Sequence, residues 1–308
     1  MAGHFLLTGG AGFIGSHLAE ALVKSGRRVV VLDKLTYAGN RENLHNIDVD
    51  LVVGDISDTT LVQRLCEEAE CVINTAAESH VTRSLSNANP FIQTNVEGAR
   101  TVVEAAAKAG VPHCIHFSTD EVFGPSNRGQ KFVINSPHKP SNAYAASKAS
   151  GEAFIQSVCI REKYPCTIVR MTNNYGERQH IEKAIPSWIA HATAKKPIPI
   201  HGQGKAERDW LHVSDFCQGI LQLIEQADPG EIHHFAGGCS RSNRSVVDRI
   251  AETCGGVEIK EGPERPGQDM RYLLEDSNTR KRLNWQPEVP FEQGLDSLVV
   301  ASLKALQK

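Results

Sequence analysis

Short runs of β-branched and apolar residues alternate with longer helical stretches through the first half of the chain. The strand-like runs cover residues 4–8, 28–33, 51–53, 71–74, 113–118 and 167–171. The helical stretches between them cover residues 13–25, 59–68, 91–109 and 144–162. This alternation predicts an α/β fold, a Rossmann-type doubly wound parallel sheet with helices on both faces.

The pattern loosens beyond about residue 172, where proline and glycine recur at shorter intervals. We therefore predict a Rossmann-type domain over residues 1–171 and a smaller C-terminal substrate lobe over residues 172–204 and 237–308. Residues 205–236 are expected to return to the Rossmann-type domain.

Composition narrows the class of protein. Of the 308 residues, 40% are hydrophobic, which is enough for a sizeable core, and the net charge of −3 gives no reason to expect nucleic acid or a membrane surface as a partner. The sequence shows neither a signal peptide nor a run of about 18 apolar residues, so no membrane span is expected.

Eight cysteines without a CxxC pair predict reduced thiols and a cytoplasmic protein. The adjacent His233 and His234 would point to opposite faces of a strand, so no metal site is expected.

A glycine-rich turn follows the first predicted strand and opens the first predicted helix. Gly9, Gly12 and Gly15 form a G-x-x-G-x-x-G pattern that includes Phe13 and Ile14. Glycines let the backbone approach a pyrophosphate closely, and a helix N-terminus offers free N–H groups and the positive end of a dipole. Its place between a strand and a helix predicts a dinucleotide site rather than a plain turn.

Two carboxylates after the next predicted strands bear on the choice of cofactor. Asp33 ends the second strand, where a carboxylate accepts hydrogen bonds from the adenosine ribose and repels a 2′-phosphate, so we predict NAD rather than NADP. The adjacent Lys34 weakens that preference. Asp55, in the Gly-Asp-Ile segment after the third strand, would either hold the adenine or form a turn, and the sequence leaves both open.

Tyr144 and Lys148 stand four residues apart at the start of a predicted helix, a spacing that puts both side chains on one face. A tyrosine with a pKa of about 10 is a poor base at neutral pH. A neighbouring ammonium group and a cationic nicotinamide would lower this pKa by stabilising the phenolate. The tyrosinate could then take the proton of a substrate hydroxyl during oxidation by NAD.

Asp120 and Glu121 follow Thr119 directly at the end of the fifth predicted strand. An elimination needs one acid to protonate a departing hydroxyl and one base to remove a proton from carbon. Adjacent carboxylates also tend to push their pKa values apart, which suits this division. The alternative interpretation is a solvated Asp-Glu pair on a loop.

The glycine pattern followed by Tyr-x-x-x-Lys resembles the extended branch of the short-chain dehydrogenase/reductase superfamily, which places a catalytic hydroxyl where Ser118 or Thr119 stands. Nearly the whole chain is similar to the nucleotide-sugar 4,6-dehydratases, and most closely to the dTDP-glucose 4,6-dehydratases. The stretches that carry this resemblance are the Thr-Asp-Glu triplet at 119–121, the Leu-Thr-Tyr-Ala-Gly-Asn loop at 35–40, and residues 76–81, 94–96, 173–176, 182–183, 208–210 and 265–267.

The resemblance implies that NAD oxidises an NDP-hexose such as dTDP- or UDP-glucose at C4, that water is eliminated across C5 and C6, and that the hydride returns to C6. It makes Tyr144 the base at the 4-hydroxyl with Lys148 as its partner, Thr119 a hydrogen-bond donor to the 4-oxygen, Asp120 the acid for the 6-hydroxyl and Glu121 the base at C5. The implied NAD contacts are Gly9, Gly12, Phe13, Ile14, Gly15, Asp33, Lys34, Thr36, Asp55, Ile56, Ala76, Ala77, Tyr144 and Lys148. The implied nucleotide-sugar contacts are His80, Asn174, Lys183, His201, Arg208, Asn243 and Arg265.

Three positions depart from the family pattern: Thr82 stands in place of a usual aspartate, and Phe123 and His201 each replace a usual tyrosine. The His201 change leaves the nucleobase open among dTDP, UDP, GDP and CDP. The resembled family pairs the helices predicted at 91–109 and 144–162 into a dimeric four-helix bundle, which implies a homodimer.

The sequence is also compatible with other functions. Another extended-branch enzyme could be a 4-epimerase, a UDP-glucuronate decarboxylase or a 5,6-dehydratase, of which the first two do not need Asp120 and Glu121. A non-catalytic NAD-sensing scaffold would not need Tyr144 or Lys148.

Overall fold

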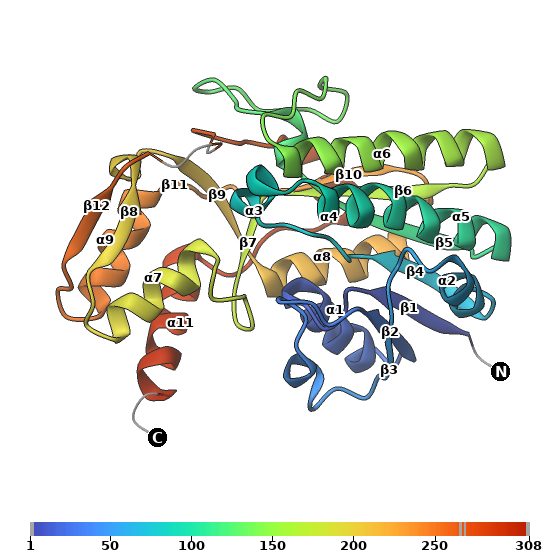
Figure 1. The fold of residues 1–308 in the computed structure, drawn as a ribbon, viewed down its shortest axis with the longest axis horizontal. Helices are drawn as coiled ribbons and strands as arrows, with labels where there is room; N and C mark the ends of the chain where they lie inside the picture. The colour runs from blue at the N-terminus through green and yellow to red at the C-terminus, as the bar shows by residue number, and fades with distance from the viewer. Residues whose placement is uncertain (1–2, 265–266, 268, 306–308) are drawn as a thin grey trace.

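The computed structural model describes residues 3–264, 267 and 269–305. A seven-stranded sheet with the order β10-β6-β5-β4-β1-β2-β3 forms its centre (Figure 1). The strands are β1 (His4–Thr8), β2 (Val29–Asp33), β3 (Asp50–Val53), β4 (Ala69–Asn74), β5 (His113–Thr119), β6 (Cys166–Met171) and β10 (Ile232–Phe235). Neighbouring strands are parallel throughout, and the strand order reverses between β1 and β4. The predicted doubly wound α/β fold is therefore confirmed.

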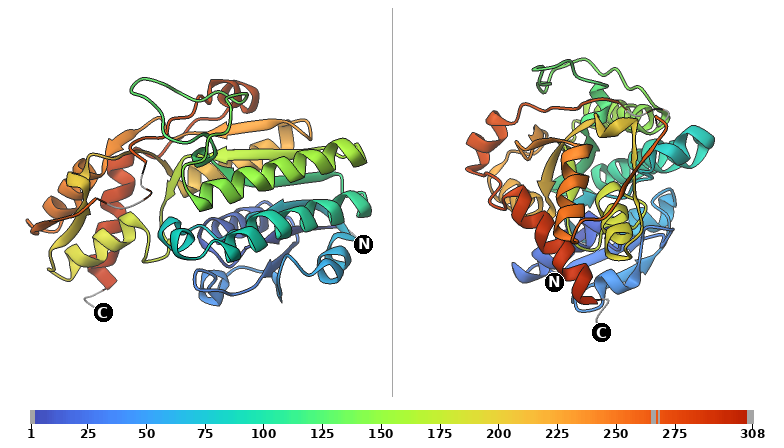
Figure 2. Two further views of the ribbon diagram at one scale, coloured as in Figure 1. Left: turned by 45° about the horizontal axis from the view of Figure 1, so that its top comes forward. Right: turned by 90° about the vertical axis from the view of Figure 1, so that its left-hand side faces the viewer.

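Helices cover both faces of this sheet (Figures 1 and 2). One face carries α1 (Phe13–Lys24) and α8 (Val213–Gln226), and the other carries α2 (Thr59–Cys66), α5 (Ala99–Ala109) and α6 (Ala143–Glu162). On β1, Phe5 and Leu7 belong to the core under α1 and α8, whereas Leu6 belongs to the core under the other three helices. Successive strand residues point to opposite faces, so both must be apolar in a sheet that is covered on both sides.

The predicted helix over residues 91–109 is interrupted. It consists of α4 (Asn89–Ile92), a π-helical turn η2 (Gln93–Gly98) and α5. Within the turn, the buried Asn95 donates from its side chain to the Ser147 hydroxyl of α6 at 2.9 Å. A Cβ on Gly151 would stand 2.3 Å from the Asn95 carbonyl oxygen, so α6 can pack this closely only because residue 151 is glycine. The helical spacing of apolar residues continues through such a turn, and the sequence therefore does not reveal it.

The second lobe, to the left of the main sheet in Figure 1, contains two small sheets. One has the order β11-β9-β7, formed by β7 (Asn173–Tyr175), β9 (Glu207–His212) and β11 (Ser240–Ser242), and the other pairs β8 (Ile198–His201) with β12 (Ile259–Gly262). The helices α7 (Ala184–Thr193), α9 (Asn243–Thr253) and α11 (Phe291–Ala305) enclose a core that contains Trp188, Trp210 and Phe291.

Short elements complete the described part of the chain: η1 (Arg41–Leu44), α3 (Val81–Ser86), η3 (Asp120–Phe123), η4 (Gly202–Gly204) and α10 (Ser277–Leu283). Residues 205–236 contribute to both the second lobe and the main sheet. Strand β9 lies in the lobe, whereas β10 is a strand of the main sheet and α8 packs against one face of that sheet. Across the residues described, no helix combines the length and the apolar character needed to cross a membrane.

Candidate active site

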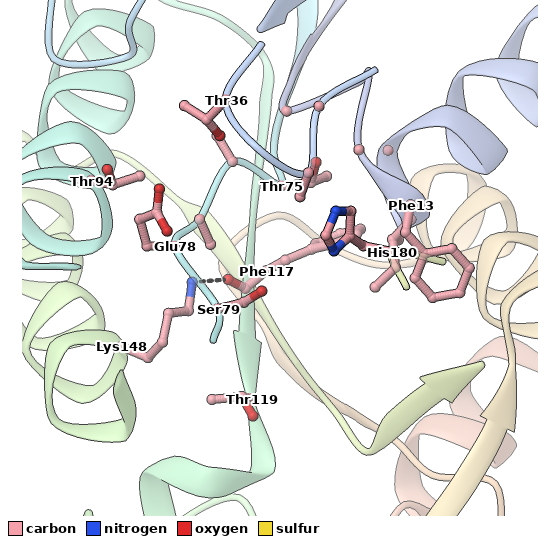
Figure 3. Close-up of a pocket in the computed structure, with 18 of the residues that line it drawn as sticks. Phe13, Thr36, Thr75, Glu78, Ser79, Thr94, Phe117, Thr119, Lys148 and His180 are labelled. Carbon is pink, nitrogen blue, oxygen red and sulfur yellow. Dashed lines mark hydrogen bonds between the residues drawn. The ribbon is translucent and has the colours of Figure 1, made fainter. Parts of the chain in front are cut away.

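A cavity of about 380 Å³ opens at the carboxyl ends of the central strands, near the reversal of strand order. Open α/β sheets bind their ligands at this position. Figure 3 shows side chains from α1, from β5, from α6 and from the loops after β2 and β4 around the cavity. The lining of the cavity includes these predicted residues: Gly9, Gly12, Phe13, Ile14, Gly15, Asp33, Lys34, Thr36, Asp55, Ile56, Ala76, Ala77, Thr119, Asp120, Glu121, Tyr144, Lys148, Asn174 and Lys183.

The glycine-rich turn forms a backbone cradle on one wall of the cavity. Gly9 has a φ of +69°, a conformation that favours glycine. A Cβ on Gly15 would stand 2.2 Å from the Gly9 carbonyl oxygen, so no larger residue fits there without a backbone shift. The N-cap of α1 is Gly12, which offers no side chain to the first N–H groups of the helix. This cradle fits the pyrophosphate of a dinucleotide.

The glycine-rich turn and the loop after β2 together hold Asp33 in place. Its carboxylate accepts hydrogen bonds from the backbone N–H groups of Ala11 at 2.9 Å and Leu35 at 2.7 Å. Burial raises the pKa of this carboxyl, while the two hydrogen bonds act in the opposite direction. The neighbouring Lys34 pairs with Asp55, whose carboxylate lies 2.6 Å from the Lys34 Nζ. Because Asp55 already balances the Lys34 charge, Lys34 argues less against NAD than the sequence suggests.

Tyr144 and Lys148 of α6 both reach the cavity. The Lys148 Nζ donates to the Phe117 carbonyl at 2.6 Å (Figure 3). Burial lowers the pKa of Lys148 to about 8. Burial also raises the pKa of Tyr144, and the charge of Glu121 adds to this rise. In the chain by itself the pKa of Tyr144 is therefore raised rather than lowered, and the cationic nicotinamide would have to supply the additional stabilisation of the phenolate.

A buried polar chain supports Lys148 from behind. The Lys148 Nζ lies 3.5 Å from Nε2 of His116, whose Nδ1 is 3.0 Å from the Asn74 amide, and Thr8 donates to the Asn74 oxygen at 2.6 Å. Burial, with the Lys148 charge, holds the pKa of His116 well below its usual value. The ring is therefore neutral at physiological pH, and no second positive charge competes with that of Lys148.

Asp120 and Glu121 lie at the end of β5, and Asp120 is only 3% exposed. Its Oδ1 accepts a hydrogen bond from Thr119 at 3.1 Å, whereas its buried Oδ2 has no partner among the described residues. Burial, followed by the charge of Glu121, raises the pKa of Asp120 to about 8. Asp120 is therefore protonated at neutral pH and can act as an acid. Its burial is not compatible with a solvated loop pair.

Glu121 is half-buried beside Asp120. Its Oε2 accepts a hydrogen bond from the Asn142 amide at 3.2 Å and lies 3.4 Å from the hydroxyl of Tyr272. Burial raises the pKa of Glu121 as well, while Asn142, Arg208 and other groups act against this rise. Two carboxyls with different surroundings, next to one tyrosine, can divide acid and base roles between them.

A buried ion pair anchors this segment from below. Glu152 of α6 is fully buried and Arg170 of β6 is 2% exposed, with 2.7 Å between the Arg170 Nη2 and the carboxylate. Ser118 donates its hydroxyl to the same carboxylate. Of the two candidate hydroxyls, Ser118 is therefore engaged in a structural contact, and Thr119 is the one that lines the cavity beside Tyr144 and acts to lower the pKa of Tyr144.

Two predicted nucleotide-sugar residues line the cavity and a third lies next to the two carboxyls. The Lys183 Nζ donates to the Ser79 carbonyl at 2.9 Å and to its hydroxyl at 3.1 Å. The Oδ1 of Asn174 is buried without a partner in the described part of the chain. The Arg208 charge lowers the pKa of Asp120 and of Glu121, against the effect of burial.

The other predicted contacts do not line this cavity as the described residues define it. The His80 Nδ1 accepts from the Arg83 N–H at 3.3 Å and caps α3. His201, at the exposed end of β8, has its Nδ1 3.0 Å from the Pro263 carbonyl. Asn243 begins α9, and its backbone N–H donates to the Ala206 carbonyl at 2.8 Å. Arg265 lies outside the described residues.

Sequence reasoning missed one cluster at the edge of the cavity. The Arg83 guanidinium lies 3.7 Å from the centroid of the Tyr37 ring and pairs with Glu182 at 2.9 Å. It thereby links the loop after β2 to the loop before α7, and both loops line the cavity. Tyr37 and Glu182 lie in the family-like stretches of the sequence, but no local pattern indicates that they share a partner.

Three comparisons with known proteins agree with this geometry. Residues 5–236 match the NAD dependent epimerase/dehydratase family. The chain is 40% identical over 301 residues to the Low-salt glycan biosynthesis protein Agl12 of Haloferax volcanii, covering 96% of each chain. It is 37% identical over 302 residues to a dTDP-glucose 4,6-dehydratase of Streptomyces niveus, covering 94% of this chain and 90% of the other. The fold matches DesIV, a dTDP-glucose 4,6-dehydratase of Streptomyces venezuelae solved with NAD bound, with a TM-score of 0.93, 36% identity and 96% of each chain covered.

Proposed function

Because this chain belongs to the NAD dependent epimerase/dehydratase family, we propose that it is an NAD-dependent nucleoside-diphosphate-glucose 4,6-dehydratase. The observation that carries this proposal is the pair Asp120 and Glu121 in the same cavity as Tyr144 and Lys148. An epimerase or a decarboxylase needs Tyr144 and Lys148 but does not need Asp120 and Glu121. The buried, protonated Asp120 is what an elimination adds, because a hydroxide is a poor leaving group unless an acid protonates it.

The chain's own residues account for each proton transfer. Tyr144 takes the proton of the sugar 4-hydroxyl, with Lys148 stabilising its phenolate, and Thr119 donates a hydrogen bond to the 4-oxygen. NAD, held by the glycine-rich turn and Asp33, would supply the hydride acceptor for C4 and the hydride donor for C6. A ketone at C4 acidifies the C5 proton, which Glu121 then removes while Asp120 protonates the departing 6-hydroxyl. The product is a 4-keto-6-deoxy sugar nucleotide.

The glycine-rich turn supports binding of NAD, and two cationic side chains support binding of the sugar nucleotide. Gly9, Gly12 and Gly15 would hold the pyrophosphate of NAD, and Asp33 its ribose. Lys183 and Arg208 would hold the diphosphate of the sugar nucleotide, since phosphate oxygens are best matched by converging Lys and Arg side chains.

The nucleobase is proposed to be thymine, on the likeness to dTDP-glucose 4,6-dehydratases. The test is a panel of dTDP-, UDP-, GDP- and CDP-glucose with NAD or NADP, read by formation of the 4-keto-6-deoxy product. We expect product from dTDP-glucose with NAD. Product from another nucleotide would correct the base alone, whereas epimerisation or decarboxylation without any 4-keto-6-deoxy sugar would overturn the proposal.

Assembly and location follow as further parts of the proposal. Apolar side chains are exposed on α3, α4 and α6: Leu85 (47%), Ile92 (47%), Phe154 (49%) and Ile160 (81%). Both α3 and α4 pack against α6, so these residues lie on adjoining helices and favour a homodimer formed through this face. All eight cysteines are free thiols, which favours a reducing compartment such as the cytoplasm. Light scattering of the purified protein tests the dimer.

A further inference from the structure

A buried tyrosine from the C-terminal segment reaches the proposed C5 base. Tyr272 is 3% exposed, and its hydroxyl oxygen lies 3.4 Å from the Glu121 Oε2. The same hydroxyl donates a hydrogen bond to the Asp269 Oδ2 at 2.7 Å. The hydroxyl has a single proton and lies within hydrogen-bond distance of both carboxyls, with the shorter contact to Asp269, so a protonated Glu121 can donate to the lone pairs of the Tyr272 oxygen.

The far end of this contact lies closer to solvent. Asp269 is partly exposed, and its Oδ2 also accepts a hydrogen bond from the exposed Ser141. The position of Tyr272 is constrained from a third side, because the Arg208 guanidinium lies 4.8 Å from the centroid of its ring and Arg208 donates to the Asp269 carbonyl at 2.9 Å. Glu121, Tyr272 and Asp269 therefore form a continuous row from the cavity to the surface.

We propose that Tyr272 is a positioning residue for Glu121 and that Tyr272 and Asp269 carry the C5 proton between Glu121 and solvent. This inference rests on the proposed dehydration, which makes Glu121 the base at C5. The role of Tyr272 follows from the contact of its hydroxyl with Glu121.

The transfer requires protons alone and no redox partner. After Glu121 removes the C5 proton, its carboxyl O–H donates to the Tyr272 oxygen while Tyr272 passes its own proton to the Asp269 carboxylate. Asp269 then exchanges this proton with water, and the reverse sequence returns a solvent-derived proton to Glu121. Each O–H bond that forms replaces one that breaks, so Glu121 can give C5 either the original proton or one from solvent.

The experiment follows hydrogen at C5 during turnover in D2O. NAD-loaded enzyme converts the sugar nucleotide that it accepts, and mass spectrometry with NMR gives the ratio of protium to deuterium at C5 of the product. Wild type is expected to incorporate solvent deuterium. In Tyr272→Phe, exchange between Glu121 and solvent should slow by about tenfold, the effect of losing one hydrogen bond to a charged group, so protium retention should rise.

Asp269→Asn keeps the tyrosine but removes the proton acceptor, and it should raise protium retention in the same direction. It also keeps the inference testable if Tyr272→Phe does not fold. The matched control is Tyr164→Phe, which removes another buried tyrosine hydroxyl, 2.9 Å from the Val111 carbonyl and away from the cavity, and should leave the ratio at the wild-type value.

The isotope ratio is measured within the product, so a general loss of activity in a damaged variant does not mimic the expected result. Unchanged deuterium incorporation in both Tyr272→Phe and Asp269→Asn would overturn the inference, as would complete protium retention in wild type. If wild type forms no 4-keto-6-deoxy sugar at all, the proposed function itself has failed, and this outcome is distinct from the other two.

Discussion

Asp120→Asn should lower activity and, as the pH rises, increase stability relative to wild type. Asparagine keeps the size of the side chain and an oxygen for the Thr119 hydrogen bond, but it has no acidic proton for the 6-hydroxyl. General acid catalysis by a positioned group is typically worth about 10²–10⁴-fold in rate, so product formation should fall by that factor.

The stability effect follows from the buried carboxyl. Burial raises the pKa of Asp120 from 3.8 to about 8, so the folded chain keeps a proton that the unfolded chain releases above about pH 4. The contribution of this group to stability is therefore fully present below pH 4 and declines by about 1.4 kcal/mol per pH unit as the pH rises toward 8. Asparagine carries no such proton and shows no such decline.

The difference in free energy of unfolding between the variant and wild type should thus shift by about 3 kcal/mol in favour of the variant from pH 5 to pH 7. For a chain of 308 residues this corresponds to a relative rise in Tm of roughly 4–5 °C, taking about 2.1 cal/mol/K per residue for the unfolding entropy. Thermal unfolding at several pH values measures it, with NAD at one saturating concentration because a bound ligand adds to the apparent stability.

The control is Asp48→Asn, which removes a carboxyl from an exposed position, and its difference from wild type should stay constant across the same pH range. A pH-independent difference for Asp120→Asn would mean that Asp120 is ionised in the folded protein. The acid for the 6-hydroxyl would then have to be another group.

Two further predictions concern the base and the buried ion pair. Glu121→Gln should keep C4 oxidation, which depends on Tyr144 and Lys148, but slow elimination by about 10²–10⁴-fold, so that the absorbance of NADH accumulates when the sugar nucleotide is added. Turnover at the wild-type rate would instead make Glu121 a bystander. Glu152→Met leaves Arg170 as an unpaired buried charge and should lower the free energy of unfolding by about 3–5 kcal/mol, or Tm by roughly 5–8 °C. Urea unfolding of Glu152→Met/Arg170→Met should show most of that loss recovered, and a double variant no more stable than the single one would contradict this.

The main sheet could be predicted from the sequence because its signals are local. The alternation of short apolar runs with helical stretches places β1 at residues 4–8, as the structure has it, and β2 to β6 within two residues of their ends, whereas for β10 it indicated only a return to the sheet within residues 205–236. Strands covered on both faces are apolar at most positions, and this makes them visible without any knowledge of their partners. The exception is η2, where a π turn within residues 91–109 depends on the approach of α6.

The candidate site divides in the same way. Gly9 and Asp33 belong to one strand-turn-helix-strand unit, and Tyr144 and Lys148 to one helical turn, so spacing along the chain implies proximity. The nucleotide-sugar residues of the second lobe come from distant segments. The resemblance to the 4,6-dehydratases implied these residues as contacts, but the sequence could not show that Lys183 reaches the cavity while His201 does not line it.

By itself, the sequence determined the fold class, the dinucleotide turn and the types of side chain that carry the chemistry, because each depends on residues a few positions apart. Only the tertiary structure decided the environments of those side chains. Burial makes Asp120 an acid, Glu152 and Arg170 pair beneath it, and Tyr272 approaches Glu121 from 151 residues away. Desolvation and long-range contact arise when separate segments exclude water from one another, and no local pattern encodes which segments will meet.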